Sequence, residues 1–346
     1  MRALTISEHG GTDKLEYRTD LPDPEPSSGE VRVRVHAAAL NHLDVFTLRG
    51  LPGVSITPPW VMGADGAGTI DRIGPGVTGV SVGDRVAVNP GISDRTCEYC
   101  RAGEQSLCVK FRLLGEHRPG TFADYLVVPY QNVRRIPDTV RFDTAAAYTL
   151  ATLTAWRMLN TRAKITETDD VLIWGIGGGV AQAAMRIALA KGARVWVTSG
   201  SDEKLARARA MGAHETINHR TQQTGKEVRA RTGKRGVTVV VDSVGEATWT
   251  ESLAALGRGG RLVTCGGTSG PTVQTDVRRL FWNQWTIMGS TMGNDAEFEA
   301  VIAAIGNPDL APVIDSTFDL ADGRSAFERM SHGEQLGKIV LRIADE

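Results

Sequence analysis

The chain has 346 residues, 41% hydrophobic and 23% charged, a composition that excludes a disordered segment or a coiled coil and allows a sizeable core. With 39 basic and 40 acidic residues the formal net charge is −1, so we expect no nucleic-acid partner. The sequence has no apolar run of about 20 residues and no signal-peptide pattern at its start, so we expect a cytoplasmic protein with no membrane partner.

Residues 1–135 are predicted to be rich in β-strands. VRVRVH (31–36) alternates apolar and polar residues as a half-buried strand does, and GVSVGDRVAV (79–88) ends in a similar run. Dense turn residues, such as those of GPGVTG (74–79), separate these runs.

From Asp143 onward the sequence predicts alternating helices and strands. The expected helices cover residues 145–160, 180–192 and 201–213. The expected strands are apolar throughout and cover residues 169–179, 193–200, 237–245 and 260–267. This alternation indicates an α/β fold with a parallel sheet covered on both faces. After about Gly289 the pattern becomes short and irregular, and it ends in a strand at 337–343.

A glycine-rich turn joins the strand expected at 169–179 to the helix that follows. A strict G-x-G-x-x-G motif fails at Val180, whereas G-x-x-G-x-x-A fits through Gly175, Gly178 and Ala181. Glycines let a pyrophosphate approach backbone N–H groups at a helix N-terminus. We therefore interpret the turn as a dinucleotide site rather than a simple tight turn. Its expected cofactor contacts are Gly175, Gly177, Gly178, Gly179 and Val180.

The next strand indicates which dinucleotide is bound. An NAD enzyme usually carries an acidic residue there, about 20 residues after the glycines, to bind the ribose 2′-hydroxyl. This chain has Thr-Ser-Gly-Ser at 198–201, without an acid. Small hydroxyls and basic side chains suit a 2′-phosphate instead, although a single lysine here could be an ordinary solvated one. We predict NADPH, bound with the help of Ser199, Ser201, Lys204 and Arg220.

Three of the four cysteines lie within twelve residues, and Cys265 stands alone. A disulfide framework would distribute them more evenly, so the spacing predicts a reduced protein with one local cysteine site.

Taken in order, these segments resemble the medium-chain dehydrogenase/reductase superfamily. The matching pieces are VRVRVHAAALNHLD, GADGAGTIDRIGPGV, VGDRVAV, CEYCRAGEQSLC, GTFADYLVV, GIGGGVA, KLARARAMGA and GKIVL. The resemblance implies a GroES-like β-rich catalytic domain at 1–150 and 290–346, with a Rossmann-type domain at 151–289 inserted in it and the active site in the cleft. It also implies a homodimer or homotetramer in which strands around 284–290 pair across subunits.

The chain departs from zinc alcohol dehydrogenases at the positions of the catalytic ligands. Asn41, Ala64 and Leu150 stand where the resemblance would place Cys, His and Cys, so we expect no catalytic zinc. The Asn-x-x-Asp pattern of Asn41 and Asp44 is similar to zinc-free quinone oxidoreductases and enoyl reductases. The resemblance further implies that Asp44 pairs with Lys338, which is also a candidate cofactor contact.

A second zinc site of this superfamily is structural, with the pattern C-x2-C-x2-C-x7-C. The chain reads D-x2-C-x2-C-x7-C through Asp94, Cys97, Cys100 and Cys108. A carboxylate is an acceptable fourth zinc ligand, so the resemblance implies a structural Zn²⁺ here. The alternative is a lobe that kept its cysteines and lost the metal.

The sequence thus predicts an NADPH-dependent oxidoreductase that passes a hydride to an α,β-unsaturated carbonyl compound or a quinone. Its expected partner is a small-molecule carbonyl, enone or quinone substrate. Without a metal, the developing enolate needs hydrogen-bond donors, for which Asn41 and His42 are candidates, while His117 is a candidate proton donor. Two alternatives stay open. One is a zinc alcohol dehydrogenase that uses His42, Asp65 and a third ligand, and the other is a nucleotide-binding protein without turnover.

Overall fold

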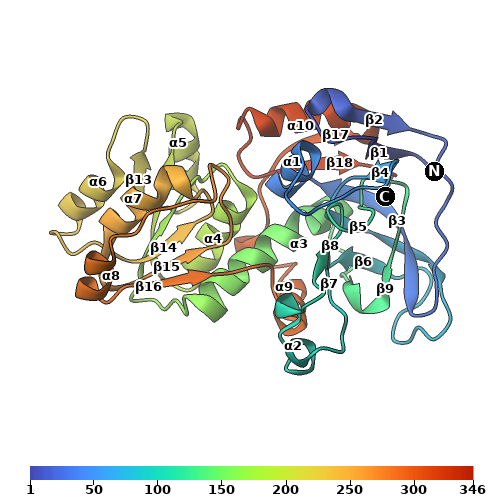
Figure 1. Ribbon diagram of the computed structural model, residues 1–346, viewed down its shortest axis with the longest axis horizontal. Coiled ribbons are helices and arrows are strands. Elements are labelled where there is room, and N and C mark those ends of the chain that lie inside the picture. Colours follow the sequence, from blue (N-terminus) through green and yellow to red (C-terminus); the bar gives the residue numbers. More distant parts are fainter. Residues whose placement is uncertain (346) are drawn as a thin grey trace. The chain divides into compact units, whose positions relative to one another are not determined.

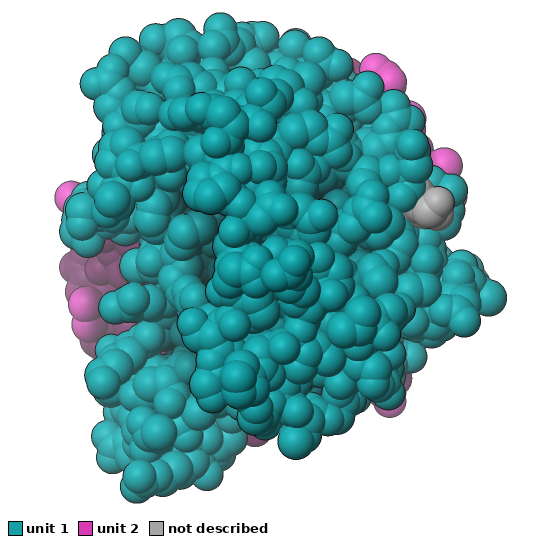
Figure 2. All heavy atoms as spheres, turned by 90° about the vertical axis from the view of Figure 1, so that its right-hand side faces the viewer, with its two compact units in different colours: residues 1–151, 293–346 teal, residues 152–292 magenta. Residues whose placement is uncertain are grey.

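The computed structural model describes residues 1–345 and divides into two compact units. Unit 1 comprises residues 1–151 and 293–346, and unit 2 comprises residues 152–292 (Figure 2). The sequence prediction put the boundaries at 150/151 and 289/290, one and three residues earlier. No helix within the described part of the chain is long and apolar enough to cross a membrane.

Unit 1 is built around a mostly antiparallel sheet with strand order β10-β6-β5-β3-β18-β17, in which β9 also pairs with β3 (Figure 1). Its strands are β3 (Glu30–Ala39), β5 (Asp65–Ile73), β6 (Arg85–Val88), β9 (Tyr125–Pro129), β10 (Val133–Arg135), β17 (Ile314–Asp319) and β18 (Lys338–Arg342). The central position of β3 follows from its sequence, because the alternating valines of VRVRVH turn into the core beside Ile70 of β5 and the valines of β6.

Smaller elements complete unit 1. A second sheet has the order β2-β1-β4, with β1 (Ala3–Ile6), β2 (Leu15–Arg18) and β4 (Trp60–Val61), and β7 (Gly91–Ile92) pairs with β8 (Arg112–Leu113). The helices are α1 (His42–Arg49), α2 (Glu98–Arg101), α3 (Phe142–Trp156), α9 (Asp295–Ala303) and α10 (Gly323–Ser331), and the last residues of α3 belong to unit 2.

Unit 2 is a parallel sheet with helices between successive strands (Figure 1). The strands are β11 (Asp170–Ile173), β12 (Arg194–Ser199), β13 (Glu215–Asn218), β14 (Val237–Asp242), β15 (Leu256–Thr264) and β16 (Thr286–Gly289). The helices are α4 (Gly179–Ala190), α5 (Asp202–Ala210), α6 (Thr224–Arg231), α7 (Glu246–Ala255) and α8 (Val277–Asn283). The strand order β13-β12-β11-β14-β15-β16 is that of a Rossmann sheet, whose ligand crevice lies where the order reverses, beside β11.

The strand expected at the end of the run 79–88 is confirmed as Arg85–Val88, and it begins after Gly79 and Gly83, whose positive φ angles of 79° and 93° an extended strand cannot contain. The structure corrects the sequence prediction in two other places. The helix expected at 145–160 changes to a π-helix over Arg157–Arg162. The segment after Gly289, expected to be irregular, contains α9, α10 and β17.

Candidate functional site

The glycine-rich turn lies at the carboxyl end of β11, directly before α4. Gly175 has a φ of +68°, a conformation that costs a glycine little, and its N–H donates to Thr198 Oγ1 at 3.1 Å. No side chain caps the first turn of α4, and the glycines there are partly exposed. The backbone N–H groups of this turn can therefore receive a pyrophosphate, so the residues fit a dinucleotide.

The carboxyl end of β12 carries the groups predicted to choose between cofactors. Ser199 Oγ accepts a hydrogen bond from the Ser201 N–H at 3.1 Å, and Ser201 Oγ caps α5 through the N–H of Lys204 at 3.3 Å. The side chain of Arg220 crosses the glycine between the two serines, and a Cβ built on Gly200 would lie 2.6 Å from Arg220 Nε. The strand end therefore combines small hydroxyls with a guanidinium and has no acid before Asp202.

In unit 1, three polar residues from distant parts of the sequence meet at the end of β3. Ala39 of β3 pairs with Asp65 of β5 on one side and with Val340 of β18 on the other. Asn41 follows β3 two residues later, and Lys338 is the first residue of β18. The strand pairing therefore brings Asn41, Asp65 and Lys338 together.

These side chains form a buried hydrogen-bonded network. Lys338 Nζ donates to Asn41 Oδ1 at 2.6 Å and to Asp65 Oδ2 at 2.8 Å, and Asn41 Nδ2 donates to Asp65 Oδ2 at 2.9 Å. The other oxygen of Asp65 accepts the Leu150 N–H at 2.8 Å and the hydroxyl of Thr149. Asp65 is fully buried and Lys338 is 3% exposed, so the charge pair is shielded from water.

The network does not fit a catalytic zinc ion. None of the three expected ligand positions offers a free donor atom. The Asn41 amide is engaged with Lys338 and Asp65, Ala64 has only a methyl group, and Leu150 contributes its backbone N–H to Asp65. Asp65, a ligand in the zinc alternative, already accepts four hydrogen bonds, which fill its acceptor sites. Zinc requires three available donor atoms, and an ammonium group in contact with two of these residues opposes a second cation.

Asp44 and His42 lie beside this network at the start of α1. Asp44 Oδ2 accepts the Asn41 N–H at 2.7 Å, and burial raises the pKa of Asp44 to about 7. The expected Asp44–Lys338 ion pair is wrong, since the ammonium binds Asp65 instead. The pKa of His42 is lowered, first by desolvation and then by the positive charges of Lys338 and Arg49, so its imidazole is neutral at neutral pH.

Lys338 is also a predicted cofactor contact. In the structure its ammonium is instead buried against Asn41 and Asp65. His117 has other partners, since its Nδ1 accepts the Leu113 N–H at 3.3 Å and faces Glu116 at 3.8 Å. None of the hydrogen bonds or ion pairs described for His117 links it to the residues around Asn41.

The cysteine lobe has the geometry of a metal site. Ligand atoms of Asp94, Cys97, Cys100 and Cys108 all lie within 4.8 Å of one another, and no other such group of His, Cys, Asp and Glu occurs among residues 1–345. Cys108 Sγ accepts the Asp94 N–H at 3.2 Å. Hydrogen bonds from the N–H groups of Cys97 and Thr96 hold the pKa of the Asp94 carboxyl well below its usual range. Three sulfurs and a carboxylate in this arrangement fit a closed tetrahedral zinc site.

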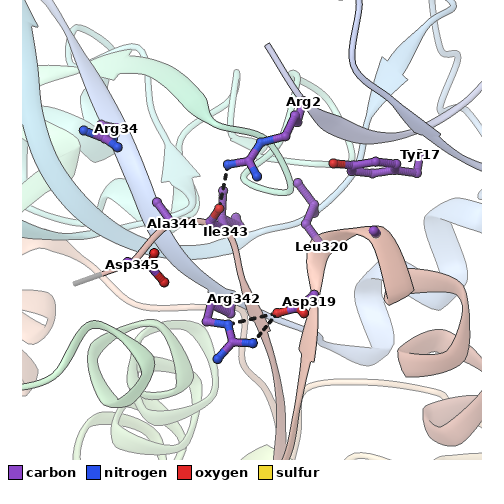
Figure 3. A pocket seen from close by; sticks show the side chains of 10 residues that line it. Arg2, Tyr17, Arg34, Asp319, Leu320, Arg342, Ile343, Ala344 and Asp345 are labelled. Atoms are coloured by element: carbon purple, nitrogen blue, oxygen red, sulfur yellow. Dashed lines mark hydrogen bonds and ion pairs between the residues drawn. The ribbon is translucent and has the colours of Figure 1, made fainter.

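A cavity of about 550 Å³ in unit 1 involves none of these residues. Several polar groups of its lining are already paired. Arg342 binds Asp319, and Arg2 donates to the Ile343 carbonyl at 2.8 Å (Figure 3). Arg34 and Asp345 also line the cavity (Figure 3). Several of the charged groups that line this cavity are therefore already engaged within the protein.

Sequence reasoning missed the role of Asp65 as the acceptor that organises this network. The only signal available was the acid directly after Ala64, the residue at an absent ligand position. Its partners Thr149, Leu150 and Lys338 lie 84, 85 and 273 residues away in the sequence, so no local pattern could reveal them.

Comparisons with known proteins agree with this description. A family model described as "Alcohol dehydrogenase GroES-like domain" matches residues 27–138, and one described as "Zinc-binding dehydrogenase" matches residues 179–307. The first lies in the β-rich unit, and the second covers most of the parallel sheet and continues into α9.

The chain is similar over nearly its whole length to proteins with several different activities. An acryloyl-coenzyme A reductase of Metallosphaera sedula is 30% identical over 345 residues, 99% of each chain. A quinone oxidoreductase of Homo sapiens is 28% identical over 350 residues, 99% of this chain and 98% of its own. The solved structure of an NAD-dependent alcohol dehydrogenase matches with a TM-score of 0.94 at 40% identity, covering 99% of this chain and 100% of that chain.

Proposed function

This chain belongs to the medium-chain dehydrogenase/reductase superfamily and is an oxidoreductase, and we propose that it is an NADPH-dependent reductase of enones or quinones that works without a catalytic metal. The observation that carries the proposal is the Asn41–Asp65–Lys338 network at the positions of the absent zinc ligands. Oxidation of an unactivated alcohol depends on a metal to lower the alcohol pKa, whereas an activated alkene or quinone is already electrophilic.

When bound, NADPH would supply a hydride to the β-carbon of the enone and become NADP⁺. The electron pair of the C=C bond moves toward the carbonyl oxygen, and a proton then gives the saturated carbonyl product. The protein must stabilise the negative charge on that oxygen. Asn41 Nδ2 donates to Asp65 at 2.9 Å and, through a long hydrogen bond of 3.4 Å, to the Ala39 carbonyl. In this proposal the substrate oxygen takes the place of the Ala39 carbonyl as the acceptor of the second hydrogen. The neutral imidazole of His42 is the second donor in this proposal.

The cofactor part of the proposal rests on the end of β12. A 2′-phosphate would meet Ser199, Ser201 and the Arg220 guanidinium without an opposing carboxylate on the strand. NADH is the alternative cofactor, because the chain is similar to an NAD-dependent alcohol dehydrogenase.

Zinc in the cysteine lobe has a structural role in this proposal. Its donor set offers four protein ligands and no open coordination position, which excludes substrate binding to the metal. Zinc there would hold the loop between β7 and β8 in its fold.

A homodimer or homotetramer remains part of the proposal. β16 is an edge strand of the parallel sheet, and α8 beside it exposes 62% of Phe281 and 68% of Trp282. An edge strand next to large exposed apolar side chains suits pairing with a second copy of the chain.

The test of the activity uses purified enzyme with NADPH or NADH and three acceptors: 3-penten-2-one, 1,2-naphthoquinone and acetaldehyde. We expect turnover of the enone or quinone with NADPH, poor reduction of acetaldehyde, and initial rates unchanged by brief exposure to 1,10-phenanthroline. Immediate loss of activity on chelation, restored by Zn²⁺, would support the zinc alcohol dehydrogenase alternative. No turnover with any acceptor would support the nucleotide-binding alternative.

The cofactor preference is tested separately with Arg220→Ala. Loss of a phosphate contact should weaken NADPH binding about 10-fold and leave NADH binding unchanged. Arg207→Ala, an exposed arginine of α5, is the matched control. Equal dissociation constants of the two cofactors in the unmodified enzyme would contradict the NADPH assignment.

A further inference from the structure

Lys338 reaches the network because a glycine precedes it. Gly337 has a φ of +107°, and a Cβ at this position would lie 2.2 Å from the Val313 carbonyl oxygen, so no other residue fits. The Lys338 N–H donates to that same carbonyl at 2.8 Å, which fixes the start of β18. The Gly-Lys pair therefore sends a long basic side chain into the core, where it is 3% exposed.

The charges around Asn41 determine which way its carboxamide faces. An ammonium can only donate, and an ionised carboxylate can only accept. Lys338 therefore requires Oδ1 of Asn41 at 2.6 Å, and Asp65 requires Nδ2 at 2.9 Å. The reversed amide would place Nδ2 against the ammonium and Oδ1 against the carboxylate, two repulsive contacts in a dry environment.

Lys338 also neutralises Asp65. The Asp65 carboxylate is fully buried and lies one hydrogen bond from Asn41. Without the ammonium 2.8 Å away, its negative charge would oppose an enolate forming at the same amide. A buried ion pair often gives no more stability than apolar residues of the same size, so stability alone does not account for this pair.

We propose that Lys338 is a positioning residue of the reaction, which holds the Asn41 amide with its Nδ2 available to the substrate oxygen and cancels the charge of Asp65. Lys338 does this without touching the substrate. In this way a buried ammonium takes over the electrostatic part of the absent metal's task. The inference rests on the proposed function, since it concerns how an enolate or reduced quinone oxygen is stabilised.

The test is a double-mutant cycle between Lys338→Met and Asn41→Ala, measured with NADPH and whichever acceptor the unmodified enzyme reduces. We expect Lys338→Met to lower kcat about 100-fold with the KM for NADPH within about two-fold, because misplacement of a donor acts on the transition state. In the Asn41→Ala background the same change should lower kcat by less than about three-fold, because the group that Lys338 positions is already absent.

Two variants separate positioning from general stability. Arg342→Met, on the same strand, removes an exposed ion pair with Asp319 and should leave kcat unchanged. Lys338→Arg keeps the charge and should retain more kcat than Lys338→Met. If Lys338→Met does not fold, the cycle is run with Lys338→Arg, whose displaced donors should also lower kcat only when Asn41 is present.

Full additivity of the two substitutions, or an unchanged kcat in Lys338→Met, would overturn the positioning role. An enzyme that reduces only acetaldehyde, with activity lost on chelation, would overturn the proposed function instead, so the two failures are distinct.

Discussion

Two regions of unit 1 correspond to the two metal positions of the superfamily, and they differ in what holds them together. The cysteine lobe keeps four ligand atoms within 4.8 Å of one another. The network at the end of β3 has none of the three zinc ligands and contains Lys338 in contact with Asn41 and Asp65. One region is suited to an external cation, and the other carries a cation of its own.

The difference follows from the surroundings of each region. The lobe extends between β7 and β8, strands of two residues each, and buries little apolar surface, so local packing stabilises it weakly. The residues around Asp65 lie inside a seven-stranded sheet, where an unpaired carboxylate would be costly. A loop can therefore be held by a metal ion, whereas a sheet core can place a lysine against its buried acid.

Of the predicted changes, removal of one cysteine thiolate of the lobe should have the largest effect on stability. Cys97→Ser should abolish binding of about one zinc per chain and lower Tm by roughly 10 °C, because the metal and the folded lobe stabilise each other. Zinc content by mass spectrometry and a calorimetric scan measure both quantities. Cys265→Ser, outside the lobe, is the control. A metal-free enzyme with an unchanged Tm would contradict the prediction.

Truncation of the buried acid Asp65 should have the second-largest effect on stability. Asp65→Ala leaves Lys338 without its counter-ion and the Leu150 N–H without its acceptor, so we expect a loss of about 3–5 kcal/mol in the free energy of unfolding. Denaturant titration measures the loss, with zinc content as a reference. A loss below about 1 kcal/mol would show that the network is not tightly coupled to the fold.

The pH dependence of stability tests the same network. The pKa of Asp44 rises from 3.8 to about 7 on folding, so the folded state favours the protonated acid. This contribution is fully present below about pH 4 and is lost as the pH rises through 7. Relative to the unmodified protein, Asp44→Asn should therefore gain up to about 4 kcal/mol between pH 4 and pH 8. Urea titrations of both proteins measure this difference in the free energy of unfolding. If the difference does not change with pH, the prediction is wrong.

The smallest effect concerns the link between the lobe and α9. Arg95 forms an ion pair with Asp295, and Gln105 Oε1 accepts the Asp295 N–H at 3.2 Å. Arg95→Ala should cost no more than about 1 kcal/mol and should speed hydrogen exchange in residues 294–298. Removal of zinc should speed exchange in the same peptide. Arg134→Ala, which removes the separate ion pair between Arg134 of β10 and Glu299 of α9, should leave the response to zinc intact.

Part of this molecule can be predicted from local sequence. The glycines at 175–179 require a close turn before a helix, the alternating valines of 31–36 require a half-buried strand, and the spacing of Cys97, Cys100 and Cys108 suits one ion. The lack of Cys and His at the ligand positions that the resemblance implies, Asn41, Ala64 and Leu150, is likewise visible in the sequence. These features depend on side chains close in sequence or on the absence of a residue type.

The tertiary structure decided which groups fill the places that the ligands left. The sequence suggested an Asp44–Lys338 pair, but the register of β3 with β5 and β18 brings Asp65 to the ammonium and leaves Asp44 on the backbone of Asn41. Arg220 comes to lie over Gly200 for a similar reason, because β12 and β13 run in parallel. The choice between two acids depends on strand pairing and on the cost of burying charge. Both depend on residues 41, 65 and 338 packing together. No short segment of the chain contains all three residues, so no local pattern could decide between the two acids.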